Sequence, residues 1–209
     1  MSFFLTGTDT EVGKTVTCAW LLLHYRYHYW KPIQSGMDNP DTEIVRKITD
    51  FHESFFFPPT YELQQPLSPH TSAKLDGIKI ELSNFKLPRN NTKIVVEGAG
   101  GVLVPINGRK EFMVDIMAKL SLPILLVARS KLGTINHTLL TINELKRRNL
   151  PLKGIILCGE KNRDNKESIE TCSGVPVVAE LNLMKTIDKN TLLLNKPGGK
   201  LDEIFASAG

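Results

Sequence analysis

The chain has 209 residues, of which 41% are hydrophobic, and its 26 Lys and Arg against 22 Asp and Glu give a net charge of +4. This composition predicts one globular domain over residues 1–209 and argues against a disordered chain. Cys18, Cys158 and Cys172 lack the spacing of a disulfide framework or a metal site, so they indicate a reducing compartment, the cytoplasm.

Two classes of partner are not expected. The basic residues are scattered except for Lys146-Arg147-Arg148, a cluster at the end of a predicted helix, where cations are favoured by the helix dipole. This pattern does not indicate a nucleic-acid surface. The N-terminus lacks the basic segment of a signal peptide, and no apolar run approaches the roughly 18–20 residues that span a bilayer.

The chain begins with a pattern typical of a phosphate-binding loop. An apolar strand is predicted over residues 3–6 and a helix from Lys14 to about His24, and the segment Gly7–Thr15 joins them. Backbone N–H groups of such a turn and the helix N-terminus together attract phosphate. Lys14 is expected to reach the terminal phosphates and the Thr15 hydroxyl to ligate Mg²⁺.

The loop departs from the usual spacing. Five residues separate Gly7 from Gly13 where four are usual, and Thr8 stands at the place of the first glycine. The alternative interpretation is an ordinary turn that contains Gly-Lys-Thr by chance. The strand on one side and the helix on the other favour the phosphate loop.

The next predicted elements are a strand and a helix separated by a loop. Residues 25–30 favour a strand that ends near residues 31–33, since Pro32 lacks the donor that a continuing strand needs. Residues 34–40 have loop composition, and the spacing of Ile44, Val45 and Ile48 predicts a helix over residues 41–49.

Residues 51–90 have the least regular pattern of the chain. The segment 55–59 is expected to interrupt any regular element, and residues 68–75 favour a short helix. We interpret residues 51–90 as an insertion packed over one end of a sheet, without a second domain.

Regular elements return after residue 92. Residues 93–97 predict a strand that ends on Glu97 and leads into a glycine turn, and residues 102–106 favour a hairpin with Asn107-Gly108 as its turn. The remaining predicted elements are helices over 113–120, 135–149 and 166–172, strands over 123–128, 152–158 and 175–179, and a turn at 196–200 before a C-terminal helix.

Apolar strands that alternate with helices predict an α/β fold, with a doubly wound, mainly parallel sheet and helices on both faces. Ligands of such sheets bind at the carboxyl ends of the strands. Thr15, Asp41 and Glu97 all follow predicted strands, and their hard oxygen atoms suit Mg²⁺. A simple nucleotide hydrolase does not require a second lysine such as Lys31. This lysine therefore indicates an anionic substrate beside the terminal phosphate.

Each of these residues also has a simpler interpretation. Glu97 can accept N–H bonds from its own glycine turn, Asp41 can be the acidic residue of a helix N-terminus, and Lys31 can be a surface lysine. His137 is predicted to be structural, because nothing in the sequence pairs with it. These interpretations do not explain why such groups recur at successive strand ends.

Together the motifs resemble those of the dethiobiotin synthetase family, in the same order along residues 5 to 160. The matching segments are Gly7–Thr15, Lys31-Pro32 with Ser35-Gly36, Pro66–His70, Glu97–Gly101, Lys131–Gly133 and Ile135–His137. The resemblance implies a P-loop NTPase-like fold and an ATP-dependent carboligase of biotin synthesis. Such an enzyme joins CO₂ to 7,8-diaminopelargonic acid (7,8-diaminononanoate), closes a cyclic urea through a carbamate and a carbamic-phosphoric mixed anhydride, and releases ADP and phosphate.

The resemblance also implies roles for individual residues. Lys14 and Lys31 are the catalytic lysines, and Thr15, Asp41 and Glu97 hold Mg²⁺. A homodimer is implied, because the loop Gly133–Asn136 binds the substrate carboxylate of the other subunit. The complete sets are Glu11, Val12, Gly13, Lys14, Thr15, Val16, Glu97, Gly98, Ala99 and Gly100 for ATP, and Thr10, Lys31, Ser35, Gly133, Thr134, Ile135 and Asn136 for the substrate.

One position departs from the family pattern. Cys158 stands where an asparagine usually contacts adenine, and a thiol lacks the paired donor and acceptor of an amide. Altered base recognition is therefore expected. The alternative function is a P-loop ATPase switch of the partition or maturation type that acts through protein partners; such proteins usually carry an extra lysine in the phosphate loop, and residues 8–12 contain none.

Overall fold

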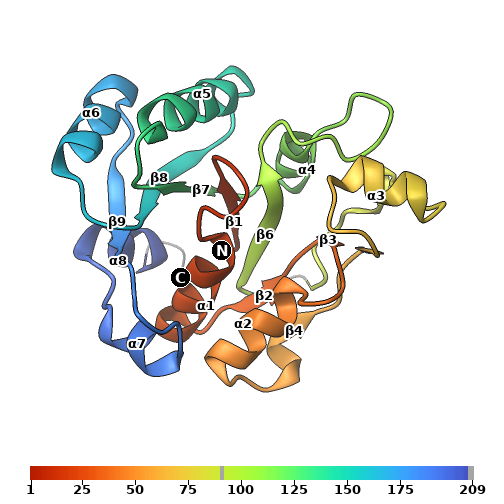
Figure 1. Ribbon diagram of the computed structural model, residues 1–209, viewed down its shortest axis with the longest axis horizontal. Helices are drawn as coiled ribbons and strands as arrows, with labels where there is room; N and C mark the ends of the chain where they lie inside the picture. The colour runs from red at the N-terminus through yellow and green to blue at the C-terminus, as the bar shows by residue number, and fades with distance from the viewer. Residues whose placement is uncertain (90–91, 207–209) are drawn as a thin grey trace.

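A seven-stranded sheet lies at the centre of the computed structural model, which describes residues 1–89 and 92–206 (Figure 1). Its strand order is β4-β2-β6-β1-β7-β8-β9, and every neighbouring pair is parallel. The strands are β1 (Phe3–Gly7), β2 (His28–Trp30), β4 (Phe56–Phe57), β6 (Ile94–Gly101), β7 (Ile124–Arg129), β8 (Leu152–Cys158) and β9 (Val177–Leu181).

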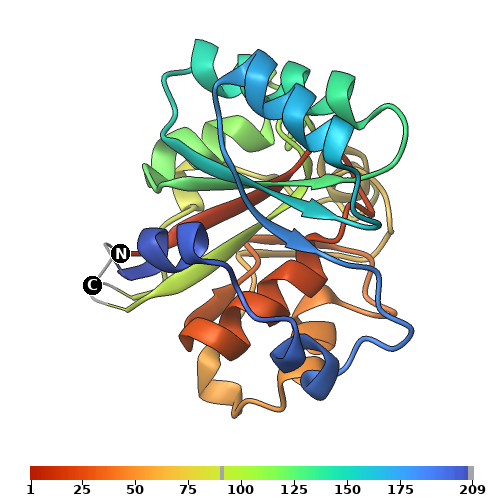
Figure 2. The same ribbon diagram turned by 90° about the vertical axis from the view of Figure 1, so that its left-hand side faces the viewer.

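Helices cover both faces of this sheet (Figure 2). Because side chains alternate along a strand, Phe3 and Leu5 of β1 pack into one core while Phe4 packs into the other. The first core contains residues of α1 (Lys14–Tyr25), α2 (Asp41–Thr49), α7 (Lys189–Leu194) and α8 (Gly199–Ala206); the second face is covered by α4 (Met113–Leu120), α5 (Thr134–Arg147) and α6 (Arg163–Ser173). The predicted doubly wound α/β fold is confirmed.

The segment after α2 is more regular than its sequence predicts. Phe56 and Phe57 form β4, an edge strand on β2, so the expectation that residues 55–59 interrupt every element was wrong. An edge strand needs only one partner, and two residues are enough to pair before Pro58 ends the strand. A second, two-stranded parallel sheet joins β3 (Ile33–Ser35) to β5 (Tyr61–Leu63), and α3 (Pro69–Leu75) follows.

Two strand boundaries differ from expectation. The second strand begins only at His28, because Arg26 adopts a left-handed conformation (φ 53°) that ends α1. β6 continues through the glycines to Gly101, so Glu97 lies in the middle of this strand rather than at its end. The register with β1 shifts between Leu5 and Gly7, where Gly7 pairs with Gly101.

The predicted hairpin around Asn107-Gly108 is absent from the described residues. They contain only a single antiparallel bridge between Pro105 and Phe112, with an Ile106 N–H bond to Glu111 O of 2.9 Å. The chain instead enters α4 directly after this bridge. No helix within residues 1–89 and 92–206 combines the length and apolar character needed to cross a membrane.

Candidate active site

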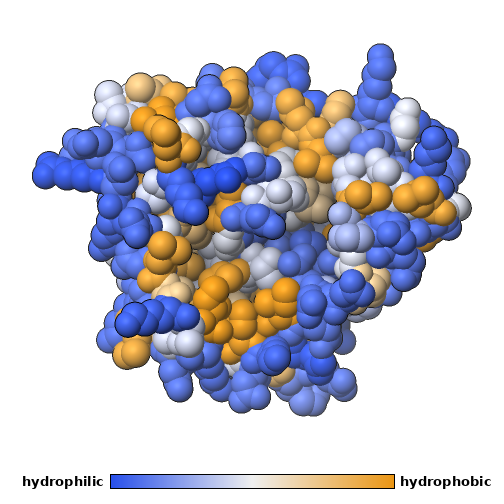
Figure 3. All heavy atoms as spheres, in the orientation of Figure 1, coloured by the Kyte–Doolittle hydropathy of each residue, from blue (hydrophilic) through white to orange (hydrophobic). Residues whose placement is uncertain are grey.

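A cavity of about 690 Å³ lies beside the loop between β1 and α1. Its lining includes most of the predicted site residues, namely Thr10, Glu11, Gly13, Lys14, Thr15, Val16, Lys31, Ser35, Asp41, Glu97, Ala99 and Gly100. Val12 and Gly98 lie behind this surface: Val12 is buried, and a Cβ on Gly98 would lie 2.9 Å from a ring carbon of Phe4. Figure 3 shows that hydrophilic side chains surround much of this face, with an apolar patch over α1 between α7 and α2.

The loop between β1 and α1 folds closely over its own first residue. A Cβ on Gly7 would lie 2.8 Å from Val12 Cγ2 and 2.9 Å from Asp9 O, so no larger residue fits there. Gly13 has a φ of 96°, which favours glycine, and it directly precedes the first turn of α1. This conformation exposes the helix N-terminus to the cavity, as phosphate binding requires.

Lys14 is bound to its own loop. Its Nζ donates to Asp9 O at 2.8 Å, and the residue is only 7% exposed. Burial lowers the pKa of Lys14, since a charged ammonium loses hydration there. A bound phosphate would offer the ammonium stronger acceptors than this single carbonyl.

The Asp9 side chain fixes the loop to a neighbouring strand. Its carboxylate forms an ion pair with Arg129 at the end of β7 and accepts a hydrogen bond from Thr10 N at 2.8 Å. The sequence analysis missed this pair, because the partners are 120 residues apart and meet only once β1 and β7 are adjacent.

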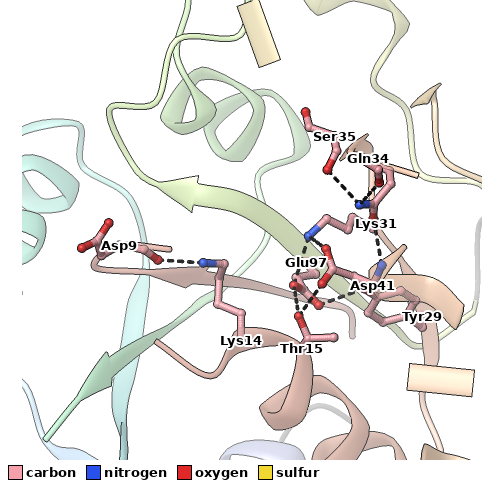
Figure 4. Close-up of polar contacts among 10 residues, drawn as sticks. Asp9, Lys14, Thr15, Tyr29, Lys31, Gln34, Ser35, Asp41 and Glu97 are labelled. Carbon is pink, nitrogen blue, oxygen red and sulfur yellow. Dashed lines mark hydrogen bonds and ion pairs between the residues drawn. The ribbon is translucent and has the colours of Figure 1, made fainter. Parts of the chain in front are cut away.

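Lys31, Asp41 and Glu97 form a buried charged cluster with Thr15 (Figure 4). Lys31 Nζ pairs with Asp41 Oδ2 and lies 3.2 Å from Glu97 Oε1. Thr15 Oγ1 lies 2.8 Å from Asp41 Oδ1 and 3.0 Å from Glu97 Oε1. Tyr29, which the sequence analysis did not identify, donates to Glu97 Oε2 at 2.8 Å. The sequence could have indicated Tyr29, because it lies two residues before Lys31 and side chains at this spacing are on the same face of an extended segment.

The charges of this cluster stabilise one another. Burial opposes the charge on Lys31, but the carboxylates of Glu97 and Asp41 outweigh it and raise the pKa of the ammonium. Burial likewise opposes ionisation of Asp41, but the Lys31 charge outweighs it and lowers the pKa of that carboxyl. Lys31 is therefore no surface lysine, and Glu97 accepts from other elements rather than only from its own glycines.

The oxygen atoms of Thr15, Asp41 and Glu97 fit a magnesium ion. The Thr15 hydroxyl has one proton, so it can donate to only one of the two carboxylates that it contacts. The other contact then joins two oxygen atoms with no proton between them, an arrangement that a cation would stabilise. Two carboxylates and a hydroxyl are ligands that Mg²⁺ accepts, with water completing the shell.

Ser35 and the adjacent Gln34 also line the cavity. Ser35 Oγ is buried and has no hydrogen-bond partner within residues 1–89 and 92–206. The adjacent Gln34, missed by the sequence analysis, accepts from Asp41 N at 3.0 Å and donates to Gly36 O at 3.0 Å, so it links the Ser35 loop to α2. Other lining residues missed as site residues are Pro66, Leu67, Ser68, Pro69 and Val104, although the sequence analysis did note the segment 66–70 as a motif.

The predicted substrate loop Gly133–Asn136 lies outside this cavity. Gly133 precedes α5 with a φ of 91°, Thr134 is buried beside Thr138, and Ile135 packs against the core of the α6 side. The structure of one chain therefore does not bring these residues to Lys31. Their predicted contact with the other subunit's substrate stays a prediction.

Cys158 lies behind the phosphate loop. Its Sγ is 3.4 Å from Thr17 Oγ1, and a Cβ on Gly13 would lie 3.1 Å from it. Burial raises the pKa of the Cys158 thiol to about 11, so it stays protonated near neutral pH.

Comparisons with known proteins identify similar sequences over most of the chain. A family model described as an AAA domain matches residues 1–191. The chain is 45% identical over 190 residues to the ATP-dependent dethiobiotin synthetase BioD of Paramagnetospirillum magneticum, covering 90% of this chain and 91% of that protein. It is 44% identical to the ATP-dependent dethiobiotin synthetase BioD of Lawsonia intracellularis, covering 92% and 93% of the two chains.

Solved structures of lower identity share the fold. The cell division ATPase MinD of Pyrococcus furiosus superposes with a TM-score of 0.55 at 15% identity, covering 100% of this chain and 99% of that one. A putative plasmid partition protein of Borrelia burgdorferi bound to AMPPNP gives a TM-score of 0.55 at 13% identity, with coverage of 99% and 98%. At such identities the likeness concerns the fold alone.

Proposed function

This chain belongs to the dethiobiotin synthetase family, and from that premise we propose how its cavity makes dethiobiotin. Its activity is ATP-dependent dethiobiotin formation, a step of biotin biosynthesis. The substrates proposed are 7,8-diaminopelargonic acid, CO₂ and ATP. The observation that supports this most is one cavity in which a phosphate loop, a second buried lysine and a serine hydroxyl without a partner among the described residues meet.

The proposed reaction has three steps. One amine of the substrate attacks CO₂ and loses a proton, which gives a carbamate. A carbamate oxygen then attacks the γ-phosphorus of ATP, the bond to ADP breaks, and a carbamic-phosphoric anhydride forms. The second amine attacks the carbamoyl carbon, loses a proton and expels phosphate, which closes the cyclic urea. No step needs a covalent enzyme nucleophile.

Two lysines are proposed to stabilise charge in the second step. Lys14 leaves Asp9 O for the transferred phosphoryl group, and Lys31 contacts both the carbamate and the γ-phosphate. Phosphoryl transfer depends mainly on positioning and on neutralising anionic oxygens, so buried ammonium groups at the junction of two anions suit it. Ser35 and Thr10, which both line the cavity, are proposed to bind the diamine.

Thr15, Asp41 and Glu97 are the proposed ligands of Mg²⁺. When bound there, the ion would supply positive charge to phosphate oxygens of ATP. Tyr29 orients Glu97 through its hydroxyl, and Gln34 holds the N-terminus of α2, where Asp41 begins the helix. Both are positioning residues in this proposal.

We further propose a homodimer that functions in the cytoplasm. In one chain Gly133–Asn136 lie outside the cavity, which agrees with a role toward a partner's substrate carboxylate at the N-terminus of α5. No nucleic acid or membrane partner is proposed. The switch-type alternative is not favoured, because the partition ATPases share only the fold while proteins with 44–45% identity are dethiobiotin synthetases.

The test is a substrate-omission experiment. Purified protein is incubated with Mg·ATP, bicarbonate and diaminopelargonate, and both dethiobiotin and phosphate are measured. We expect equimolar formation of the two products and neither product when bicarbonate or the diamine is omitted. ATP hydrolysis that needs neither compound would instead support the switch function.

A further inference from the structure

Lys31 pairs with the buried carboxylate of Glu97 and with the half-buried carboxylate of Asp41. Its ammonium pairs with Asp41 Oδ2 and with Glu97 Oε1, and its side chain is 6% exposed. Thr15 Oγ1 contacts Asp41 Oδ1 and the same Glu97 oxygen. The ammonium therefore binds oxygen atoms of the two carboxylates that the proposed function assigns to Mg²⁺ (Figure 4).

Among residues 1–89 and 92–206, no other cation lies within ion-pair distance of these carboxylates. Lys14, the other lysine that lines the cavity, donates instead to Asp9 O at 2.8 Å (Figure 4). Without Lys31, the buried carboxylate of Glu97 and the half-buried carboxylate of Asp41 would lie close together without an ammonium partner, which is an unfavourable arrangement. Lys31 thus preserves their position while no metal is bound.

A divalent cation and this ammonium compete for the same oxygens. Two positive charges at contact distance from one carboxylate oxygen repel each other, and a small divalent ion requires close oxygen ligands. The ammonium ends a flexible four-carbon chain, so it can move while the carboxylates stay in place. The cavity beside it, which Lys31 also lines, provides the space.

We propose that Lys31 is an internal substitute for the divalent cation, which occupies the position between Asp41 and Glu97 in the free enzyme and is displaced into the cavity when the metal binds. This inference rests on the proposed function, since it takes Thr15, Asp41 and Glu97 as the metal ligands. It makes the catalytic position of Lys31 a consequence of metal binding. An enzyme without metal therefore keeps this lysine away from the substrate anions.

The test measures metal binding without nucleotide or substrate. Mn²⁺ is titrated into the nucleotide-free protein and free Mn²⁺ is followed by electron paramagnetic resonance, for wild type, Lys31→Met, Lys31→Arg and Lys166→Met. Lys166 is the control, because its Nζ forms an ion pair with Glu180 Oε2 at a distance of 2.9 Å. Neither residue lines the cavity. Removing the competing charge should lower the Mn²⁺ Kd of Lys31→Met at least about tenfold, while the other two variants stay within about threefold of wild type.

An unchanged or weaker affinity in Lys31→Met would overturn the inference. Loss of the lysine leaves the carboxylates of Asp41 and Glu97 without an ion-pair partner, so the thermal unfolding of this variant is also measured with and without Mn²⁺. Mn²⁺ should raise its Tm by more than it raises that of wild type, and an equal or smaller rise contradicts the inference. The two proposals fail separately: absence of dethiobiotin synthesis by wild type refutes the function, whereas the Mn²⁺ titration uses no substrate.

Discussion

The Thr15 hydroxyl in the first turn of α1 lies 3.0 Å from Glu97 Oε1 in the middle of β6, although 82 residues separate them. The pairing of β1 with β6, which places Leu5 opposite Glu97, brings them together. The same carboxylate accepts a hydrogen bond from Lys31 at Oε1 and another from Tyr29 at Oε2. Glu97 is therefore the point at which three elements of the site meet.

Replacing either buried lysine should abolish most turnover. Lys14→Ala and Lys31→Ala are each expected to lose at least about two decades of kcat, because one preorganised charged donor to a transition-state anion is typically worth ~2.7–4 kcal/mol. Steady-state dethiobiotin synthesis measures the effect. The control is Lys189→Ala, which removes an exposed ion pair with Asp50 and should leave kcat unchanged. Near-normal turnover in Lys31→Ala would exclude it as a catalytic residue.

Metal binding should require the hydroxyl group of Thr15 and not only a side chain of that size. Thr15→Val keeps the shape but removes the oxygen shared by Asp41 and Glu97, and we expect at least about a tenfold rise in the Mg²⁺ concentration needed for half-maximal rate. Thr15→Ser retains the hydroxyl and should stay within about threefold of wild type. Equal metal requirements in the two variants would contradict a ligand role for this oxygen.

The Asp9–Arg129 pair should matter for ATP binding more than for stability. Both side chains are partly exposed, so Arg129→Ala is expected to cost at most about 1 kcal/mol of unfolding free energy. Without Arg129 the loop loses its ion pair to β7 and samples more conformations. We therefore expect the KM for ATP to rise about three- to tenfold. A double-mutant cycle with Asp9→Asn checks the pair, and strictly additive effects on KM would show that the two residues act independently.

Nucleotide affinity should fall at alkaline pH because of Lys14. Burial lowers the pKa of Lys14 from 10.5, and phosphate attracts only the protonated form. As pH rises through this lowered pKa the charge is lost, so the ADP association constant should decrease with a midpoint below 10.5. Calorimetric titration measures it. In Lys14→Arg the guanidinium keeps its charge, and the alkaline decrease should disappear even if affinity is lower throughout.

Base selectivity should be weak if position 158 reads the base in this family. Cys158 cannot offer a paired amide donor and acceptor, and its Sγ contacts Thr17 behind the loop. We expect kcat/KM values for ATP, GTP and CTP within about tenfold of one another. A strong preference for ATP would show that another segment recognises adenine.

Local sequence patterns predicted the elements that depend on neighbouring residues. Three elements have the expected bounds: the helices over residues 41–49 and 113–120 and the strand over 152–158. Their apolar spacing and the residues that end them are local features of the sequence. Two of the wrong predictions involve long-range pairing. β4 exists because β2 offers an edge, and β6 continues past Gly100, which has a φ of 63°, because Gly7 of β1 pairs with Gly101.

The sequence by itself determined which residues are candidates for the site: a phosphate loop, a second lysine at residue 31, and oxygen atoms at the ends of predicted elements that we propose as metal ligands. It also placed them at one edge of a parallel sheet, since the connections of such a sheet bring the loops after its strands to the same side. Only the tertiary structure decided which groups are partners. Lys14 rests on Asp9 O, and Lys31 lies between Asp41 and Glu97. Burial makes these pairings necessary, because charges removed from water must find partners wherever the fold brings them together.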